Sequence, residues 1–309
     1  MNSLQNLASQ RLPLYLPWSK PNIEIGSGFN SAAIASDSLP WASKCPFIID
    51  DAKCVVEIDG GVSSYREGNS SSSAQHSEHL SASLGVTVGC KFLSASVTGS
   101  YDKSVSDNFA GTRVSKNISI QAGHVRFQAD PVLTPFARNV LCRSENEFRS
   151  IFGDYYVVGY QIGAEAGGCV TITHSDQSEE KRVQVQATAK VLWMKKTIST
   201  TTSSKMVSSD DSISFNSYDT LRQHNDEVKE THLLEEIHQK SNECMDRIDN
   251  LHATVEKTIM DLGLGTNDGA SVKECVRLCD SGVVVQLILA PYSKLAEYVA
   301  LTSSRSSDI

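Results

Sequence analysis

Cysteine and histidine are the residues whose spacing could build a metal or nucleophilic site in this chain, which contains eight of each. Such chemistry needs CxxC or HExxH spacing for a metal, or a GxSxG turn for a nucleophilic serine. None of these patterns occurs, and His76 and His79, which flank a Ser-Glu pair, are a weak metal-ligating pair in a polar loop. The sequence therefore predicts no catalytic residue, no metal and no cofactor, and it indicates that the protein is not an enzyme.

The remaining reactive groups also lack a site. Gly26-Ser27-Gly28 lacks the further glycine and the lysine that a phosphate-binding loop requires. The even number of cysteines allows disulfides, and Cys45 with Cys54 and Cys275 with Cys279 are the closest pairs in sequence. A chain of this length does not depend on such bonds for its stability.

Composition limits the class of protein. The chain has 309 residues, of which 40% are hydrophobic and 21% charged, so it can build a sizeable core. The net charge of −8 and the lack of a basic block exclude nucleic acid as an expected partner. No apolar run reaches the roughly 18 residues of a membrane-spanning helix. Residues 1–18 lack the apolar core of a secretory signal. We therefore expect a soluble protein that is cytoplasmic, unconventionally secreted or already in a mature form.

Two segments alternate apolar and polar residues with a period of two, which is typical of a strand with one dry and one wet face. In the first segment, from Leu80 to Val97, Lys91 lies on the polar phase. In the second, from Val183 to Trp193, Lys190 does so. The apolar residues expected on one face are Leu80, Ala82, Leu84, Val86, Val88 and Phe92, and then Val183, Val185, Ala187, Ala189, Val191 and Trp193.

Two interpretations of this alternation remain open. Most alternating strands in soluble proteins belong to ordinary half-buried sheets. A strand that crosses a membrane needs about 9–11 residues with alternating faces, and both segments reach that length. One chain supplies too few strands for a wide barrel, so the second interpretation requires several copies in a ring.

The other segments predict a mixed fold. Strand-like patterns occupy 52–67, 118–122, 152–173, 213–215 and 283–289, and 131–151 has roughly helical spacing. Residues 226–262 repeat apolar positions every seven residues, which predicts a long amphipathic helix or helix pair. This helix either packs on its own domain or forms a coiled coil with a partner.

The segment Phe152-Gly153-Asp154-Tyr155-Tyr156-Val157, followed by Gly159, Gly163 and Ala164, resembles the signature of the membrane attack complex/perforin (MACPF) superfamily. Asp154 and Tyr155 stand where the family has Thr-His, and Ala164 replaces the second glycine of a pair. Gly167-Gly168 follows closely and offers the backbone freedom instead. The order of the other segments also matches the family, from the entry motif at 25–30 to a closing strand and helix at 284–298.

The resemblance implies an α+β fold, with a bent central four-stranded antiparallel sheet flanked by two helical clusters. Residues 22–300 would form the pore-forming domain, after an extended segment at 1–21 and before a polar tail at 301–309. Within it, 80–115 and 183–210 match the family's two transmembrane hairpin regions, and 226–262 is an elaboration. The glycines of the signature would let the sheet bend and open, although a twisted sheet corner alone would also need them.

The resemblance also implies a function. The soluble chain would associate with a membrane afterwards, because members oligomerise on a membrane, and each subunit inserts two amphipathic hairpins into a shared β-barrel. The partners would be membrane lipids, further copies of the chain, and a separate targeting protein where loops or lipid contacts do not suffice, as in two-component fungal cytolysins. The period-two segments then describe the inserted state, and we expect helices there before insertion. The alternative is a non-lytic MACPF-like module that binds membranes or a partner protein.

Overall fold

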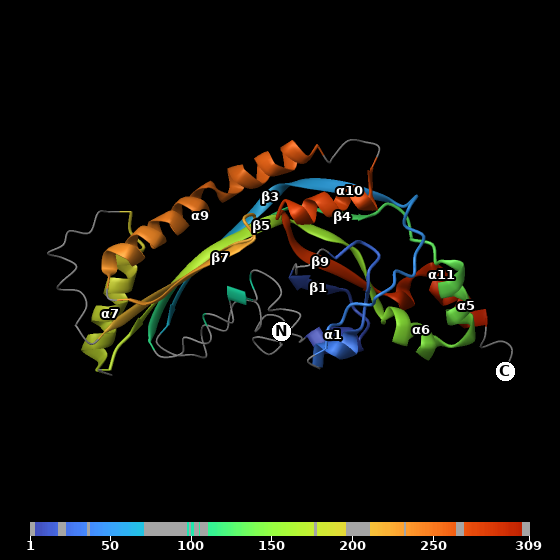
Figure 1. Cartoon of the computed structure of the whole chain (residues 1–309), viewed down its shortest axis with the longest axis horizontal. Helices are drawn as coiled ribbons and strands as arrows, with labels where there is room; N and C mark the ends of the chain where they lie inside the picture. The colour runs from blue at the N-terminus through green and yellow to red at the C-terminus, as the bar shows by residue number, and fades with distance from the viewer. Residues whose placement is uncertain are drawn as a thin grey trace.

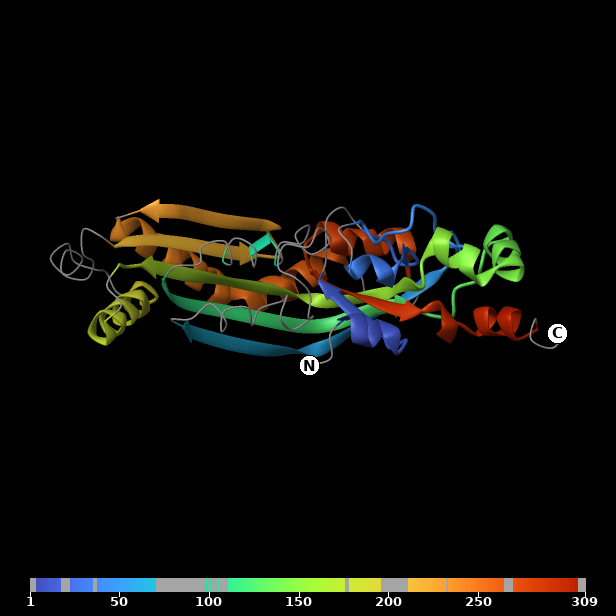
Figure 2. The ribbon, with the colours of Figure 1, turned by 90° about the horizontal axis from the view of Figure 1, so that it is seen from below.

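A long, bent antiparallel sheet forms the body of the molecule (Figures 1 and 2). The structure is a computed structural model, and the residues that it describes are 4–17, 23–35, 38–70, 98, 100, 101, 105, 111–175, 178–195, 211–231, 233–263 and 269–304. The predicted segment around 80–97, with Leu80, Ala82, Leu84, Val86, Val88 and Phe92, lies outside these residues.

Three long neighbouring strands make the centre of the sheet: β3 (Lys53–Ser70), β4 (Thr112–Phe127) and β5 (Tyr155–Thr173). The outer edge of β5 pairs first with β9 (Val284–Pro291) and then with β6 (Ser212–Asp219). Strand β1 (Leu14–Pro17) extends the sheet beyond β9, and β7 (His224–Thr231) extends it beyond β6. The α+β class and the bent antiparallel sheet are therefore as expected.

The sheet has nine strands among the described residues, not the four expected. Strand β5 is so long that two different strands share its outer edge, and each of these pairs with a further strand, β9 with β1 and β6 with β7. The two short strands β2 (Gly28–Phe29) and β8 (Ala270–Ser271) pair with β5 and β3. Alternation along the sequence predicts that a strand exists, but it does not count the partners in a sheet.

The long helix α9 (Leu234–Leu262) lies along one face of the sheet (Figure 1). It contacts β4, β5 and β6 and buries its heptad positions, among them Ile237, Cys244, Ile248 and Leu251. The helix therefore packs on its own domain. Residues 226–231 belong to strand β7 and not to the helix predicted from residue 226. A strand of polar residues has no strong period-two signal, which is why the pattern missed it.

Helices gather at the other end of the sheet, at the right of Figure 1. The pair α5 (Pro135–Arg143) and α6 (Glu145–Phe152) begins at the side-chain caps of Thr134 and Ser144, in the segment predicted to be helical. The closing elements η3 (Tyr292–Lys294) and α11 (Ala296–Ser303) lie at this end, whereas α10 (Val272–Asp280) lies nearer the middle of the molecule, where it contacts β3 and β8. An aromatic core holds this end together: Phe148, Phe152, Tyr292 and Tyr298.

The N-terminal segment is folded into this end and not extended throughout. Residues Leu4–Ser9 form α1, and β1 follows and pairs with β9; η1 (Ser31–Ala35) lies nearby. At the other terminus, 301–304 continue α11 and its cap, and the rest of the predicted polar tail lies outside the described residues. Neither of the two cysteine pairs that are closest in sequence forms a disulfide, because every described cysteine is a free thiol.

Candidate functional site

The ends of four strands meet at the left of Figure 1. Ser70 at the end of β3 pairs with Arg113, and Thr173 at the end of β5 pairs with Ser212. The connections 71–111 and 174–211 therefore leave the sheet from one end, each between two adjacent antiparallel strands. These connections hold nearly all of the two predicted hairpin regions, except that 112–115 belong to β4. A connection of this kind could lengthen both of its strands without changing the strand order.

Helix α7 (Glu179–Leu192) occupies part of the second connection. The side chain of Ser178 caps it by accepting a hydrogen bond from the backbone N–H of Lys181, and Glu179 and Glu180 suit the positive end of the helix dipole. The residues that it buries follow helical spacing, and they are Val185, Thr188, Ala189 and Leu192. The segment Glu179–Leu192 is thus helical, as the resemblance led us to expect.

The sequence of α7 carries the period-two alternation of a strand as well as the spacing of a helix. In the helix the side chain of Val183 is 58% exposed and Ala187 is also exposed, although both belong to the apolar phase of the alternation. The polar Thr188 is buried, and its hydroxyl donates to the carbonyl of Gln184 in the preceding turn. The helix thus buries only some of the six alternating apolar side chains of 183–193. A mismatch of this kind between local pattern and structure is expected at functional sites.

Trp193, at the C-terminal cap of α7, anchors the helix to the sheet. Its indole N–H donates to the carbonyl of Val114 in β4 at 3.0 Å, and its ring packs beside Phe215 of β6. Gly168 makes the room for this contact, since a Cβ there would lie 3.0 Å from the Trp193 ring and 3.2 Å from the sulfur of Cys244. Gly168 therefore lets α7 and α9 approach the sheet at the same place.

Polar contacts fasten both ends of α7. At its start, Lys181 Nζ lies 2.7 Å from Asp211 Oδ2, next to β6, and both side chains are largely buried. After its end, Lys195 Nζ contacts Asp246 and Asp249 of α9 at 2.7 and 2.6 Å. The ring of His238 also meets the carbonyl of Leu192 at 3.3 Å. Continuing the pairing of Thr173 with Ser212 by one step would place His174 opposite Asp211, so the Lys181–Asp211 pair has to break if β5 and β6 lengthen.

The buried ion pair gives a first prediction. Replacing Asp211→Asn removes the carboxylate next to the largely buried Lys181 ammonium, and we expect this to lower the free energy of unfolding by about 3–5 kcal/mol. The double variant Lys181→Met/Asp211→Leu removes both charges and should unfold near the wild-type denaturant midpoint. Equal losses in the single and the double variant, measured by urea unfolding, would show that the charge pairing is not what matters here.

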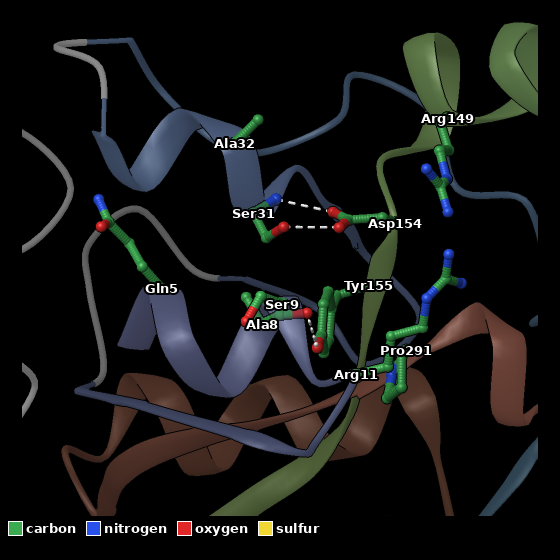
Figure 3. Close-up of a pocket in the computed structure, with 10 residues that line it drawn as sticks. All are labelled: Gln5, Ala8, Ser9, Arg11, Ser31, Ala32, Arg149, Asp154, Tyr155 and Pro291. Carbon is green, nitrogen blue, oxygen red and sulfur yellow. Dashed lines mark hydrogen bonds between the residues drawn. The ribbon is translucent and has the colours of Figure 1, made fainter. Parts of the chain in front are cut away.

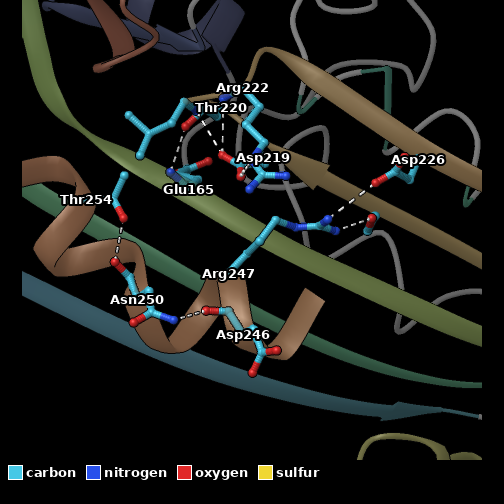
Figure 4. Close-up of polar contacts among 11 residues, drawn as sticks. Glu165, Asp219, Thr220, Arg222, Asp226, Asp246, Arg247, Asn250 and Thr254 are labelled. Carbon is cyan, nitrogen blue, oxygen red and sulfur yellow. Dashed lines mark hydrogen bonds and ion pairs between the residues drawn. The ribbon is translucent and has the colours of Figure 1, made fainter. Parts of the chain in front are cut away.

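Helix α9 is itself fixed to the sheet, so it offers α7 a firm support. Arg247 of α9 donates to the hydroxyl of Ser217 at 3.0 Å and contacts Asp226 at 3.5 Å, which joins the helix to both β6 and β7 (Figure 4). The turn between these strands is held by Asp219 and Thr220, and the Thr220 hydroxyl accepts the backbone N–H of Glu165 in β5. The β6–β7 hairpin and α9 thus form one unit beside α7.

Residues of the first connection contact the opposite face of the sheet. The rings of Tyr101 and Tyr218 lie 4.6 Å apart, and with Val105 they form a small buried cluster over Cys169. Neighbouring residues of a strand point to opposite faces, so Cys169 and Gly168 mark the two sides. Arg113 is also buried near this cluster. The described parts of the two connections therefore flank the sheet on both sides.

The sheet bends where three strands share an irregularity. The register shifts lie side by side at Ile58/Val62 in β3, Gln121/Gly123 in β4 and Gln161/Ile162 in β5. A Cβ at Gly163 would lie 1.8 Å from the carbonyl oxygen of Ile120, so no other residue allows this approach of β5 to β4. Bulges of this kind increase local twist and bend a strand. The bend of the sheet thus has a defined place between its two ends.

The signature residues are spread along β5 and do not gather at one site. Phe152 ends α6, and Gly153 follows at φ +82°, where a Cβ would lie 2.2 Å from the carbonyl oxygen of Phe29. Tyr155 donates its hydroxyl proton to the carbonyl of Leu12 at 3.0 Å. These residues fasten the N-terminal segment to the start of β5. The remaining members lie further along the strand: Tyr156, Val157, Gly159, Gly163, Ala164, Gly167 and Gly168.

Several contacts around α7 could not be found from the sequence. Trp193 with Val114, Lys181 with Asp211 and the role of α9 as a support join residues that are far apart in the chain. Within the described residues, no group of three or more metal-ligating side chains comes together. None of the described helices combines the length and the apolar character needed to span a membrane.

No protein-family model matches the chain, and no curated protein matches it. Among solved structures, it is similar to GNIP1Aa from Chromobacterium piscinae, with 12% identity, a TM-score of 0.33 and coverage of 94% of this chain and 56% of that chain. It is also similar to wild-type pneumolysin, with 10% identity, a TM-score of 0.36 and coverage of 92% of this chain and 61% of that chain. A Bacteroides thetaiotaomicron protein with a MAC/Perforin domain is 12% identical, with a TM-score of 0.27 and coverage of 65% of this chain and 48% of that chain.

The chain thus spans 48–61% of the length of these three proteins. At such identities and TM-scores the likeness concerns the fold alone.

Proposed function

We propose that this chain is a pore-forming protein that oligomerises on a membrane and inserts two amphipathic β-hairpins per subunit into a shared β-barrel. The observation that carries the proposal is α7, a helix with the apolar alternation of a strand, placed between the adjacent ends of two antiparallel strands. Release of α7 would let β5 and β6 grow into one longer hairpin, and release of 71–111 would do the same for β3 and β4.

The contacts of 183–193 favour the docked helix α7 in water and an extended strand in lipid. In the folded chain α7 gains the burial of Val185, Leu192 and Trp193, together with the contacts of Lys181 and Lys195. In lipid, an extended segment 183–193 would bury all six of its apolar side chains on one face. Each square ångström of apolar surface removed from water stabilises this state by about 25 cal/mol. Every backbone N–H and C=O in lipid must also be paired, which a closed barrel of such strands achieves.

Self-association would follow from the edges of the sheet. Towards the α7 end, β3 and β7 are the outermost strands among the described residues. Strand β3 exposes Val62 and Tyr65, at 71% and 48%, along a stretch where β4 is its only described strand partner. An exposed strand edge with apolar side chains is prone to pair with another chain. We therefore expect copies to meet edge to edge, so that their lengthened hairpins join one barrel.

Dye release from liposomes, together with electron microscopy of the protein on lipid, tests the proposal. We expect release that rises with protein concentration, and ring-shaped or arc-shaped oligomers under the same conditions. The lipid composition of the liposomes is varied, so that the same assay identifies the lipid that supports release. Membrane-bound protein that stays monomeric and releases no dye would instead indicate the non-lytic binding module.

A further inference from the structure

A cavity of about 370 Å³ opens at the base of the sheet, on the side of α1 and α6 and away from α7 (Figure 3). Its walls come from α1, η1, α6, the start of β5 and the end of β9. The volume lies within the range of small-molecule sites, which is about 300–1,000 Å³. The pore-forming proposal gives this cavity no role.

Two arginines line the cavity, and Figure 3 shows their guanidinium groups pointing towards each other from α6 and from the turn after α1. Neither Arg11 nor Arg149 forms an ion pair with any residue that the structure describes. Both charges also act on the phenol of Tyr298, where they oppose the rise in pKa that burial causes. Two cations so placed repel one another unless an anion lies between them.

The acidic and hydroxyl groups that line the cavity already have hydrogen-bond partners within the protein. Asp154 accepts hydrogen bonds from the backbone N–H and the hydroxyl of Ser31, at 2.7 and 2.5 Å. The Tyr155 hydroxyl donates to the carbonyl of Leu12. The single carboxylate of the cavity is thus held against Ser31, and the lining keeps an excess of positive charge.

The backbone of Arg11 adds an independent observation. Arg11 has φ +55°, a left-handed conformation that favours glycine, and it lies in the turn after α1, where its backbone N–H donates to the carbonyl of Ala8. Glycine there would cost no strain, but it would place no guanidinium in the cavity. A strained residue that aims a charge into a cavity is a reason to look for a ligand.

We propose that Arg11 and Arg149 together bind an oxyanion of the phosphate type. A guanidinium donates two parallel N–H bonds to such a group, and two guanidinium groups that face each other can hold it from both sides. The volume leaves room for a phosphate monoester with a small organic part. A soluble phosphate compound and a lipid phosphate headgroup share this chemistry.

Inorganic phosphate is the first probe, added at constant ionic strength with chloride as the reference salt, while thermal unfolding and binding heat are recorded. We expect phosphate to raise the unfolding temperature of the wild type, and Arg149→Gln to weaken binding by at least about tenfold. Arg11→Gly should unfold at a higher temperature than the wild type without phosphate, because it relieves strain and repulsion, yet it should lose the response to phosphate. Arg143→Gln is the matched control, since Arg143 is an exposed arginine paired with Glu147.

The source of the phosphate is decided by a second arm, with vesicles of phosphatidylcholine alone or mixed with phosphatidic acid. Retention on phosphatidic acid that Arg11→Gly and Arg149→Gln abolish would identify a lipid headgroup. Retention that they leave unchanged, with loss of the phosphate response, would identify a soluble ligand. No phosphate response in the wild type, or an equal response in all variants, would overturn the proposal, whether or not the protein forms pores.

Discussion

A reversible cross-link between α7 and α9 is expected to abolish dye release from liposomes, and reduction of the link to restore it. The variant Lys195→Cys/Asp246→Cys, bridged by a short bis-methanethiosulfonate reagent, places the link where Lys195 Nζ and Asp246 Oδ1 lie 2.7 Å apart. Because Arg247 holds α9 to β6 and β7, the link would fix the end of α7 to the sheet. The segment 183–193 could then not move away to lengthen β5.

The chain offers a matched control for this experiment. Lys273→Cys/Asp50→Cys replaces another surface pair, at 3.4 Å, which joins α10 to the segment before β3 and does not involve α7. Both variants should carry Cys142→Ser, because Cys142 is exposed, whereas burial raises the pKa of Cys169 to about 11 and that of Cys244 to about 12, which keeps these thiols protonated. Dye release at full strength from protein whose 195–246 link is complete would rule out refolding of α7.

Removing Trp193, which anchors α7 to the sheet, is expected to speed dye release, whereas the cross-link is expected to block it. Trp193→Ala deletes a buried indole and its hydrogen bond to Val114, a loss of about 3–5 kcal/mol in a well-packed site. If that loss falls on the docking of α7, the released form becomes more than about a hundredfold more populated. We therefore expect Trp193→Ala to unfold at a lower temperature but to release dye with a shorter lag than the wild type.

Phe148→Ala separates this effect from general destabilisation. Phe148 is as deeply buried, but it packs on Phe152, Tyr292 and Tyr298 at the far end of the sheet. We expect it to lower the unfolding temperature by a similar amount without shortening the lag. The lag is measured from stopped-flow dye release at equal amounts of bound protein. Two variants with the same lag would mean that docking of α7 does not limit insertion.

Local patterns predicted the long strands β3, β4 and β5 and the long helix α9, together with α5, α6, β6, β9 and α11. The alternation in β4 and β5, the helical spacing of α5 and α6 and the heptads of α9 each reflect one buried face, and burial of one face leaves its period in the sequence. Strand β7 escaped because its residues are mostly polar, and α1 because a six-residue helix carries little periodicity. The number of strands in the sheet was underestimated for the reason that pairing partners come from distant segments.

The features of the candidate site also fall into those that the sequence predicted and those that it did not. The sequence by itself determined the two-faced character of 183–193 and the glycines that β5 needs, since both are properties of neighbouring residues. Only the tertiary structure decided that this segment is a helix, that Trp193 fits beside Gly168, and that Arg11 and Arg149 share a cavity. The physical reason is that each of these depends on contacts across the fold, and such contacts set the conformation of a segment whose local pattern alone favours another.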